Sequence, residues 1–86
     1  MEGIIQPARA VAPGQILTRE LEARGWTQKD LARIMGRPTQ EINEIVKGSK
    51  RISLETALEL AEALSTSAEF WGNMEAQYRL ALDKYT

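Results

Sequence analysis

The sequence predicts an all-α fold of five short helices, and three observations lead to this prediction. Apolar residues recur every three or four positions in five consecutive segments, which is the period of an amphipathic helix. These segments are separated by glycines or by residues that cap helices. No segment of useful length alternates apolar and polar residues as a strand would. At 86 residues the chain is expected to form one domain with a modest core, which a second copy would help to stabilise.

The front of the chain predicts an arm followed by a first helix. Residues 1–12 show no helical period, and we expect an extended arm there. A helix is expected over residues 13–24, because it opens with a proline, which favours the first helical turn, and is followed by Gly25. Its apolar stripe consists of Ile16, Leu17 and Leu21.

Two further helices are predicted in quick succession. Thr27 and Asp30 stand three residues apart, as in a capping box, so a second helix is expected to begin there and to end at Gly36. Its buried face is expected to consist of Leu31, Ala32 and Met35. A third helix is expected from near Pro38 to Lys47, with Gly48 at its stop position.

The rear of the chain predicts two more helices. Ser53 is expected to cap a fourth helix, and Thr66 with Glu69 predict a capping box for a fifth. The expected inner face of the fourth helix is Leu54, Ala57, Leu58, Ala61 and Leu64. The apolar face of the fifth is Trp71, Met74, Tyr78, Ala81, Leu82 and Tyr85. We therefore divide the chain into an arm (1–12), a four-helix core (13–65) and a C-terminal helix (66–86).

Composition excludes several classes of function. The chain contains no cysteine and no histidine, so disulfides and thiolate metal sites are impossible and zinc would lack its preferred ligands. The same absences remove most nucleophile and general-base arrangements. We expect no enzyme, no metal, no cofactor and no small-molecule substrate.

Charge and hydropathy point toward a location and a partner. No apolar run approaches the roughly 20 residues that span a bilayer, and no signal peptide is recognisable, so we expect a cytoplasmic protein without a membrane partner. The net charge is −1, but residues 1–51 carry +3 and residues 52–86 carry −4. This asymmetry favours a front half that faces phosphate, although scattered surface charge would also produce it.

The segment from Gln28 to Lys47 carries the most informative motif. Ala32 is followed four residues later by Gly36, and Ile42 and Ile45 lie six and nine residues beyond that glycine. A small residue lets two helices cross closely, and glycine suits a tight turn with positive φ. This spacing is typical of the DNA-binding helix-turn-helix, although a plain helical hairpin remains an alternative.

The third helix then has an outward face suited to reading base edges. With Ile42, Ile45 and Val46 turned inward, helical geometry places polar side chains on the opposite side. Amides can pair with adenine, a lysine with guanine or phosphate, a threonine with a thymine methyl, and a glutamate with cytosine. The residues expected to contact bases are Thr39, Gln40, Asn43, Glu44 and Lys47. Glu44 can instead be solvated or paired with a nearby cation, and that is the interpretation we prefer for Glu41.

Phosphate contacts are expected at both ends of the motif. The start of the second helix offers free backbone N–H groups and the positive end of the helix dipole. The residues expected to contact phosphate are Gln28, Lys29, Lys50 and Arg51. The basic residues can alternatively serve only solubility.

These residues carry a resemblance to a known family. The run Thr27 to Ala32, with Gly36, Ile42, Ile45, Gly48 and Arg51, resembles the lambda-repressor-like, Xre-type helix-turn-helix superfamily. Within it, four stretches are similar to HigA-type antitoxins, also called VapI or plasmid-maintenance antidote proteins. They are residues 13–17, 42–45, 56–61 and 66–71. The resemblance covers about residues 13–80.

The resemblance implies a five-helix repressor domain that dimerises through its C-terminal helix. It also implies a HigB-type, mRNA-cleaving toxin as partner, repression of the shared operon, and a prokaryotic cytoplasm. The sequence departs from the family pattern at Gln15, Ser65 and Gly72, where the family usually has glutamate, glycine and a larger apolar residue. The last departure leaves the detail of the dimer interface open.

The C-terminal helix carries more apolar surface than one small core needs. A symmetric dimer would bury it and place two recognition helices about 34 Å apart on a palindromic operator in double-stranded DNA. The residues expected in this interface are Trp71, Met74, Tyr78, Ala81 and Leu82. The alternative is that Phe70 and Trp71 roof the chain's own core, and we expect Phe70 inside and the later positions shared.

Three functions remain from the sequence alone. The leading one is a homodimeric antitoxin that represses its own operon. The second is a phage-like repressor without a toxin, and the third is a protein-interaction module whose DNA affinity is lost to Glu41 and Glu44. Acidic side chains of the rear half are candidates for meeting a basic partner, namely Glu59, Glu62 and Glu75.

Overall fold

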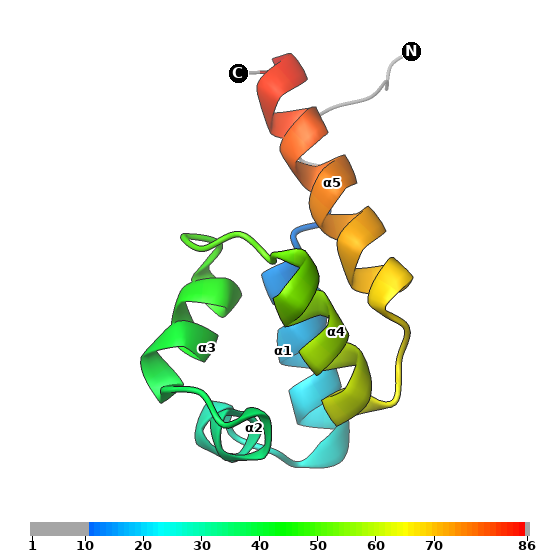
Figure 1. The fold of residues 1–86 in the computed structure, drawn as a ribbon. Coiled ribbons are helices and arrows are strands. Elements are labelled where there is room, and N and C mark those ends of the chain that lie inside the picture. The colour runs from blue at the N-terminus through cyan, green and yellow to red at the C-terminus, as the bar shows by residue number, and fades with distance from the viewer. Residues whose placement is uncertain (1–10, 86) are drawn as a thin grey trace.

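Five helices account for nearly all of the chain that the structure describes, as Figure 1 shows. The structure is a computed structural model, and it describes residues 11–85. The helices are α1 (Pro13–Arg24), α2 (Gln28–Met35), α3 (Thr39–Lys47), α4 (Leu54–Leu64) and α5 (Ala68–Tyr85). Residues 11–85 contain no strand, which confirms the all-α prediction. The expected arm lies almost entirely outside the described residues.

The ends of the first helices follow from the capping residues in the sequence. α1 begins with Pro13 in its first turn and ends at Gly25, whose φ of 70° is left-handed. At the start of α2, the Thr27 hydroxyl accepts from the backbone N–H of Asp30 at 3.0 Å, while the Asp30 carboxylate accepts from that of Thr27 at 2.9 Å. This reciprocal pair is the predicted capping box.

One hydrophobic core draws side chains from all five helices. It contains fully or almost fully buried leucines, isoleucines, alanines and one tryptophan. Its largest members are Trp71, Leu17, Leu31, Ile42, Leu60 and Leu64. In Figure 1, α5 runs along α4 and then extends beyond the body formed by α1 to α4. The core therefore anchors both α2 and α3, which contribute buried side chains to it. The C-terminal part of α5 projects away from this body.

The expected inner face of α4 was wrong in part. Ala57 and Leu64 are buried as predicted, but Leu54 and Leu58 are 75% and 55% exposed. Leu60 and Thr56 take their places in the interior. The helix is rotated relative to the prediction because α4 is apolar around most of its circumference, so that period alone does not select the buried side.

The start of α5 also differs from the prediction. The hydroxyl of Ser67, not that of Thr66, accepts from the backbone N–H of Phe70 at 3.0 Å and so caps the helix. The Thr66 hydroxyl instead accepts from the indole N–H of Trp71 at 2.8 Å. The expected capping box of Thr66 with Glu69 is therefore absent.

Phe70 and Trp71 exchange the roles expected of them. Trp71 has no exposed surface, whereas Phe70 is 43% exposed and packs edge-on against the tryptophan ring. Neighbouring residues of a helix point about 100° apart, so only one of the two can enter the core. Trp71 belongs to the chain's own core and has no surface left for the dimer interface in which we expected it.

Candidate nucleic-acid interface

A tight turn between α2 and α3 sets the geometry of the candidate interface. Gly36 follows α2 with a left-handed φ of 69°, and the backbone N–H of Arg37 donates to the carbonyl of Ala32 at 2.9 Å. Ala32 and Ile42 are both buried in the common core. The small residue and the glycine therefore stand where the motif requires them.

The outward face of α3 has the orientation predicted from its period. Ile42 and Ile45 are buried and Val46 is half-buried, which turns the opposite side of the helix to solvent. Among the residues expected to contact bases, three are exposed and two are half-buried. The exposed ones are Thr39, Gln40 and Lys47, and the half-buried ones are Asn43 and Glu44. A short helix thus presents hydroxyl, amide, carboxylate and ammonium groups together.

Two hydrogen bonds organise this face. The side-chain N–H of Asn43 donates to the side-chain oxygen of Gln28 at 3.2 Å, which links α3 to the first residue of α2. The side-chain N–H of Gln40 donates to the Glu44 carboxylate at 3.4 Å, one turn along α3. The structure therefore brings a residue expected to contact bases, Asn43, against one expected to contact phosphate, Gln28.

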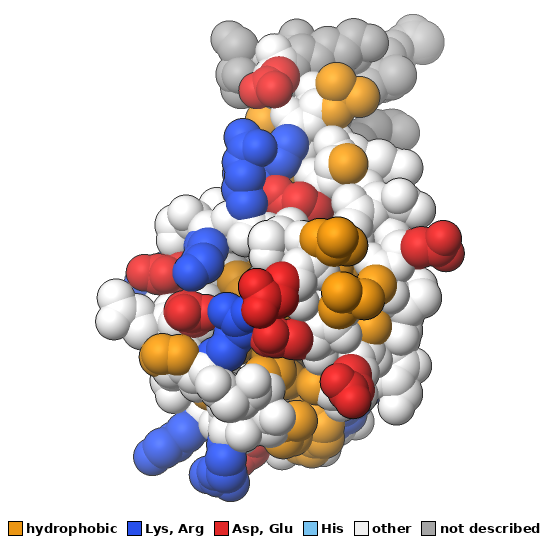
Figure 2. Space-filling view, in the orientation of Figure 1, with side chains coloured by type: hydrophobic (Ala, Val, Ile, Leu, Met, Phe, Trp, Pro, Cys, Tyr) orange, Lys and Arg blue, Asp and Glu red, His pale blue; other side chains and the backbone are white. Residues whose placement is uncertain are grey.

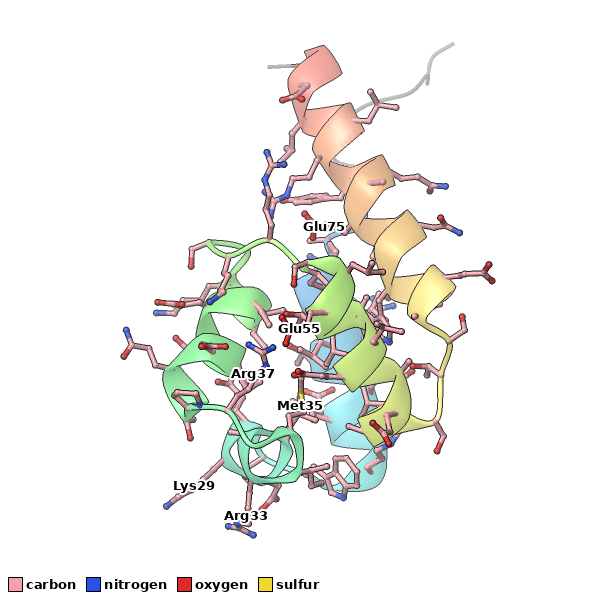
Figure 3. All side chains as sticks on the ribbon, viewed as in Figure 1. Lys29, Arg33, Met35, Arg37, Glu55 and Glu75 are labelled. Carbon is pink, nitrogen blue, oxygen red and sulfur yellow. The ribbon has the colours of Figure 1, made fainter. Side chains whose placement is uncertain are left out.

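The residues expected to contact phosphate lie at the surface. Lys29, Lys50 and Arg51 are exposed and Gln28 is half-buried. Figure 3 shows Lys29 projecting from α2, with Arg33 projecting beside it. The sequence analysis overlooked Arg33, although its spacing of four residues from Lys29 places both on one helical face.

The acidic residues nearest the motif differ in what they contact. Glu41 pairs with Arg37 at 2.7 Å and lies 3.9 Å from Lys50, which confirms the structural role preferred for it. The Thr27 backbone and hydroxyl hydrogen bonds, with smaller contributions from Arg33 and Lys29, lower the pKa of Asp30. Glu41 is thus paired with cations, which reduces its repulsion of an approaching polyanion, whereas Asp30 stays ionised and lies 3.9 Å from Arg33.

Arg37 holds the beginning of α3 against α4. Its guanidinium donates through Nε and Nη2 to both carboxylate oxygens of Glu59 and through Nη1 to Glu41. This bidentate hydrogen bonding lowers the pKa of Glu59. Figure 2 shows acidic and basic side chains gathered over α3 and α4, where this cluster lies. The sequence analysis missed the link to Glu59 because the two residues are far apart in the chain.

Arg79 holds the other end of α3. It pairs with Glu75 one turn earlier in α5 and donates to the backbone carbonyl of Gly48 at 3.4 Å. Gly48 caps the C-terminus of α3 with a left-handed φ of 82°. Glu75 is 8% exposed, so it is engaged inside the chain, and its expected role as a partner contact is corrected. α3 is thus fixed at one end to α4 and at the other to α5.

Gly14 sets the distance between α1 and the end of α3. A Cβ placed on Gly14 would lie 2.2 Å from the carbonyl oxygen of Val46 and 2.7 Å from that of Ile45. Both oxygens belong to the backbone, so neither can move aside by a change of side-chain rotamer. The two helices therefore touch at a point where only glycine fits, and the sequence analysis assigned no such role to this residue.

Two negative findings apply to the described part of the chain. Residues 11–85 contain no group of acidic side chains arranged to hold a metal ion. Within the same residues, no helix combines the length and apolar character needed to cross a bilayer.

Comparison with known sequences agrees with this geometry. The chain matches the helix-turn-helix family model HTH_3 over residues 17–71. It is 35% identical over 74 residues to virulence-associated protein I of Dichelobacter nodosus, covering 85% of this chain and 68% of that protein. The chain spans about two thirds of the length of the curated relatives it matches, 68% of one and 64% of another.

Solved structures are also similar to this chain over most of its length. An addiction module antidote protein of the HigA family from Coxiella burnetii is similar with a TM-score of 0.81 and 33% identity, covering 86% of this chain and 82% of that one. The antitoxin HigA of Pseudomonas aeruginosa, solved with the higBA promoter, gives a TM-score of 0.83 and 34% identity, covering 87% and 83%.

Proposed function

Because this chain belongs to the helix-turn-helix family, with HigA-family antitoxins among its structural neighbours, we propose that it is a cytoplasmic antitoxin and autorepressor. It binds an operator in the promoter of its own toxin–antitoxin operon. It also neutralises, by direct contact, a HigB-type toxin that cleaves mRNA. The relative from Pseudomonas aeruginosa, solved with its promoter, supports the DNA-binding part of this proposal.

The outward face of α3 is the observation that carries the proposal. Its isoleucines are buried in the core, and its polar side chains turn outward, with Thr39, Gln40 and Lys47 exposed and Asn43 and Glu44 half-buried. A helix of this width fits the major groove, where amide and lysine side chains discriminate base pairs by about 1–3 kcal/mol for each good pair. Lys29, Lys50 and Arg51 lie at the surface near the ends of the motif and supply the phosphate contacts.

The same proposal includes a homodimer formed through α5. The C-terminal part of this helix extends away from the body (Figure 1), and its apolar residues are only partly buried. Of the expected interface, Met74, Tyr78, Ala81 and Leu82 are half-buried and keep surface to share. Leu80, which was not among the expected residues, is 67% exposed. A two-fold dimer would place two α3 helices on a palindromic operator.

Binding to the chain's own promoter at two salt concentrations tests the DNA part of the proposal. Each neutralised phosphate lowers the logarithm of the binding constant by about 0.9 per logarithm of salt concentration. With Lys29→Ala, we expect weaker binding on all sequences and a slope smaller by about 1 per subunit. If the chain does not bind its promoter at low salt, the DNA-binding proposal is overturned.

Co-expression with the neighbouring gene tests the antitoxin part. We expect the neighbouring product to arrest growth alone, and growth to return with a stable complex when this chain is present. If promoter binding is observed but no neighbouring product binds the chain, the protein is a repressor without a toxin. If the complex forms without promoter binding, it is an interaction module.

A further inference from the structure

The surface between α2 and α4 is hollowed. A depression of about 390 Å³ is lined by Ile34, Met35, Glu59, Glu62 and Ala63. Ile34 is 51% exposed, whereas its neighbours in the lining, Met35 and Ala63, pack against the core. No residue of α3 lines this depression, so it is separate from the face proposed to read DNA. A depression lined by three apolar side chains and two carboxylates is a surface that a partner side chain of mixed character can fill.

The outer side of α4 extends this depression into a larger surface. Leu54 and Leu58 stand exposed one turn apart, next to the carboxylates of Glu55 and Glu62. Helical geometry places Glu55 and Glu62 beside the leucines, on the side of α4 that faces the depression, and Glu62 itself lines the depression. Within residues 11–85, neither glutamate has a cationic partner, whereas Glu59 is already held by Arg37. We call this combination of Ile34, Met35, Leu54, Glu55, Leu58, Glu62 and Ala63 the α4 surface.

We infer that the α4 surface is the docking site for the toxin, and that it receives a segment of that protein which carries apolar side chains flanked by lysine or arginine. This inference rests on the proposed function. The apolar side chains would enter the depression and cover the exposed leucines. The cations would pair with Glu55 and Glu62, the two carboxylates of the α4 surface, neither of which has a cationic partner among residues 11–85.

Charge complementarity selects this occupant over the others. DNA is repelled by the same carboxylates, which lie in the half of the chain with a net charge of −4. A second copy of this chain is disfavoured because a two-fold contact would bring two copies of the same acidic surface together, with no cation of that surface to pair with Glu55 and Glu62. A protein that grips RNA must present cations to phosphate, so a toxin that cleaves mRNA is a basic partner.

Isothermal titration of the purified toxin into this chain tests the inference. Three variants are compared with the natural chain: Ile34→Asp, Glu62→Lys and the control Glu69→Lys. Glu69 is an exposed glutamate of α5 that lies outside the α4 surface. Glu69→Lys changes the net charge by the same amount as Glu62→Lys. Circular dichroism and promoter binding confirm that each variant is folded.

We expect Ile34→Asp to weaken toxin binding about tenfold or more, because it places a charge where apolar side chains of the segment would dock. We expect a similar loss from Glu62→Lys, because it places a cation against the cations of the segment. We expect Glu69→Lys to leave it within about twofold. If the natural chain binds toxin and both test variants bind it equally well, the docking inference is wrong while the antitoxin function stands. If the natural chain does not bind toxin at all, the proposed function itself fails.

Discussion

The side-chain nitrogen of Asn43 lies 3.2 Å from the side-chain oxygen of Gln28 and donates a hydrogen bond to it. Asn43 lies on the outward face of α3, and Gln28 is the first residue of α2. The first backbone N–H groups of α2 are oriented to donate hydrogen bonds to a phosphate oxygen. This amide pair therefore joins the two kinds of contact that we propose, one to a base and one to the DNA backbone.

The Asn43–Gln28 pair predicts non-additive effects on DNA binding. We expect Asn43→Ala to weaken operator binding by about 1–3 kcal/mol, because it removes a base contact. We expect Gln28→Ala to weaken it less, and the double variant to cost less than the two single changes together by about 0.5 kcal/mol or more. Fluorescence anisotropy with labelled operator measures all four affinities. Strict additivity would contradict a coupled pair.

Gly14 predicts that α1 and α3 cannot tolerate an added methyl group. We expect Gly14→Ala to lower the free energy of unfolding by about 1–3 kcal/mol, because the new Cβ would overlap the backbone carbonyls at the end of α3. Gly72→Ala is the matched control, since a Cβ there meets nothing within 4 Å. It should instead stabilise α5 by up to about 1 kcal/mol. Urea unfolding measures the free energy of unfolding of both variants. Equal changes in the two variants would refute the close contact between Gly14 and the end of α3.

Ser65 predicts a stabilising substitution. It ends α4 with a φ of 57°, a left-handed conformation that disfavours residues with a Cβ. Ser65→Gly should raise the free energy of unfolding by up to about 1 kcal/mol, part of the relief being offset by the greater chain entropy of glycine. The reverse exchange, Gly25→Ser at a φ of 70°, should destabilise the protein. Thermal unfolding measures both, and a lower melting temperature for Ser65→Gly would contradict this account.

The Arg37–Glu59 pair predicts a specific dependence of stability on pH. The guanidinium lowers the pKa of Glu59 below its ordinary value of 4.5. A carboxylate with a lowered pKa stabilises the fold above its unfolded pKa, and this stabilisation is lost as pH falls through the folded value. Glu59→Gln should therefore be less stable than the natural chain at pH 7, and the difference should shrink below pH 4.5.

The measurement for Glu59 is the urea midpoint across pH, with Glu62→Gln as control. Glu62 has no cationic partner among the described residues, so its variant should differ little from the natural chain at any pH. The pKa of Asp30 is lowered in all three proteins, and its contribution cancels in the comparison. A gap between Glu59→Gln and the natural chain that stays constant down to pH 3 would show that Arg37 does not act through the charge of Glu59.

The helix ends were predictable where chemistry is local. Glycines in the left-handed region end α1, α2 and α3, and Thr27 and Ser53 cap α2 and α4 as their side chains predict. The start of α5 was not predictable in the same way. Thr66 and Ser67 are both good capping residues. Which of them caps α5 depends on Trp71, because its buried indole N–H donates a hydrogen bond to the Thr66 hydroxyl.

The orientation of α4 and α5 depended on contacts that period alone does not encode. Leucines and alanines occur around most of α4, so two stripes fit the helical period, and packing selected the one that contains Leu60. In the candidate site, the outward face of α3 followed from its two buried isoleucines. The positions of Arg37 and Arg79 did not, because each connects segments distant in the chain.

Operator binding by a variant with four alanines on α3 tests the central claim most directly. Thr39, Gln40, Asn43 and Lys47 all lie on the outward face and none is buried, so their joint replacement should leave the fold intact. Anisotropy titrations with the promoter fragment and with a scrambled duplex of equal length give the specific and non-specific affinities. We expect the preference for the promoter to disappear while weak, salt-sensitive binding to both duplexes remains. An undiminished preference for the promoter would contradict the claim that this face of α3 reads the operator.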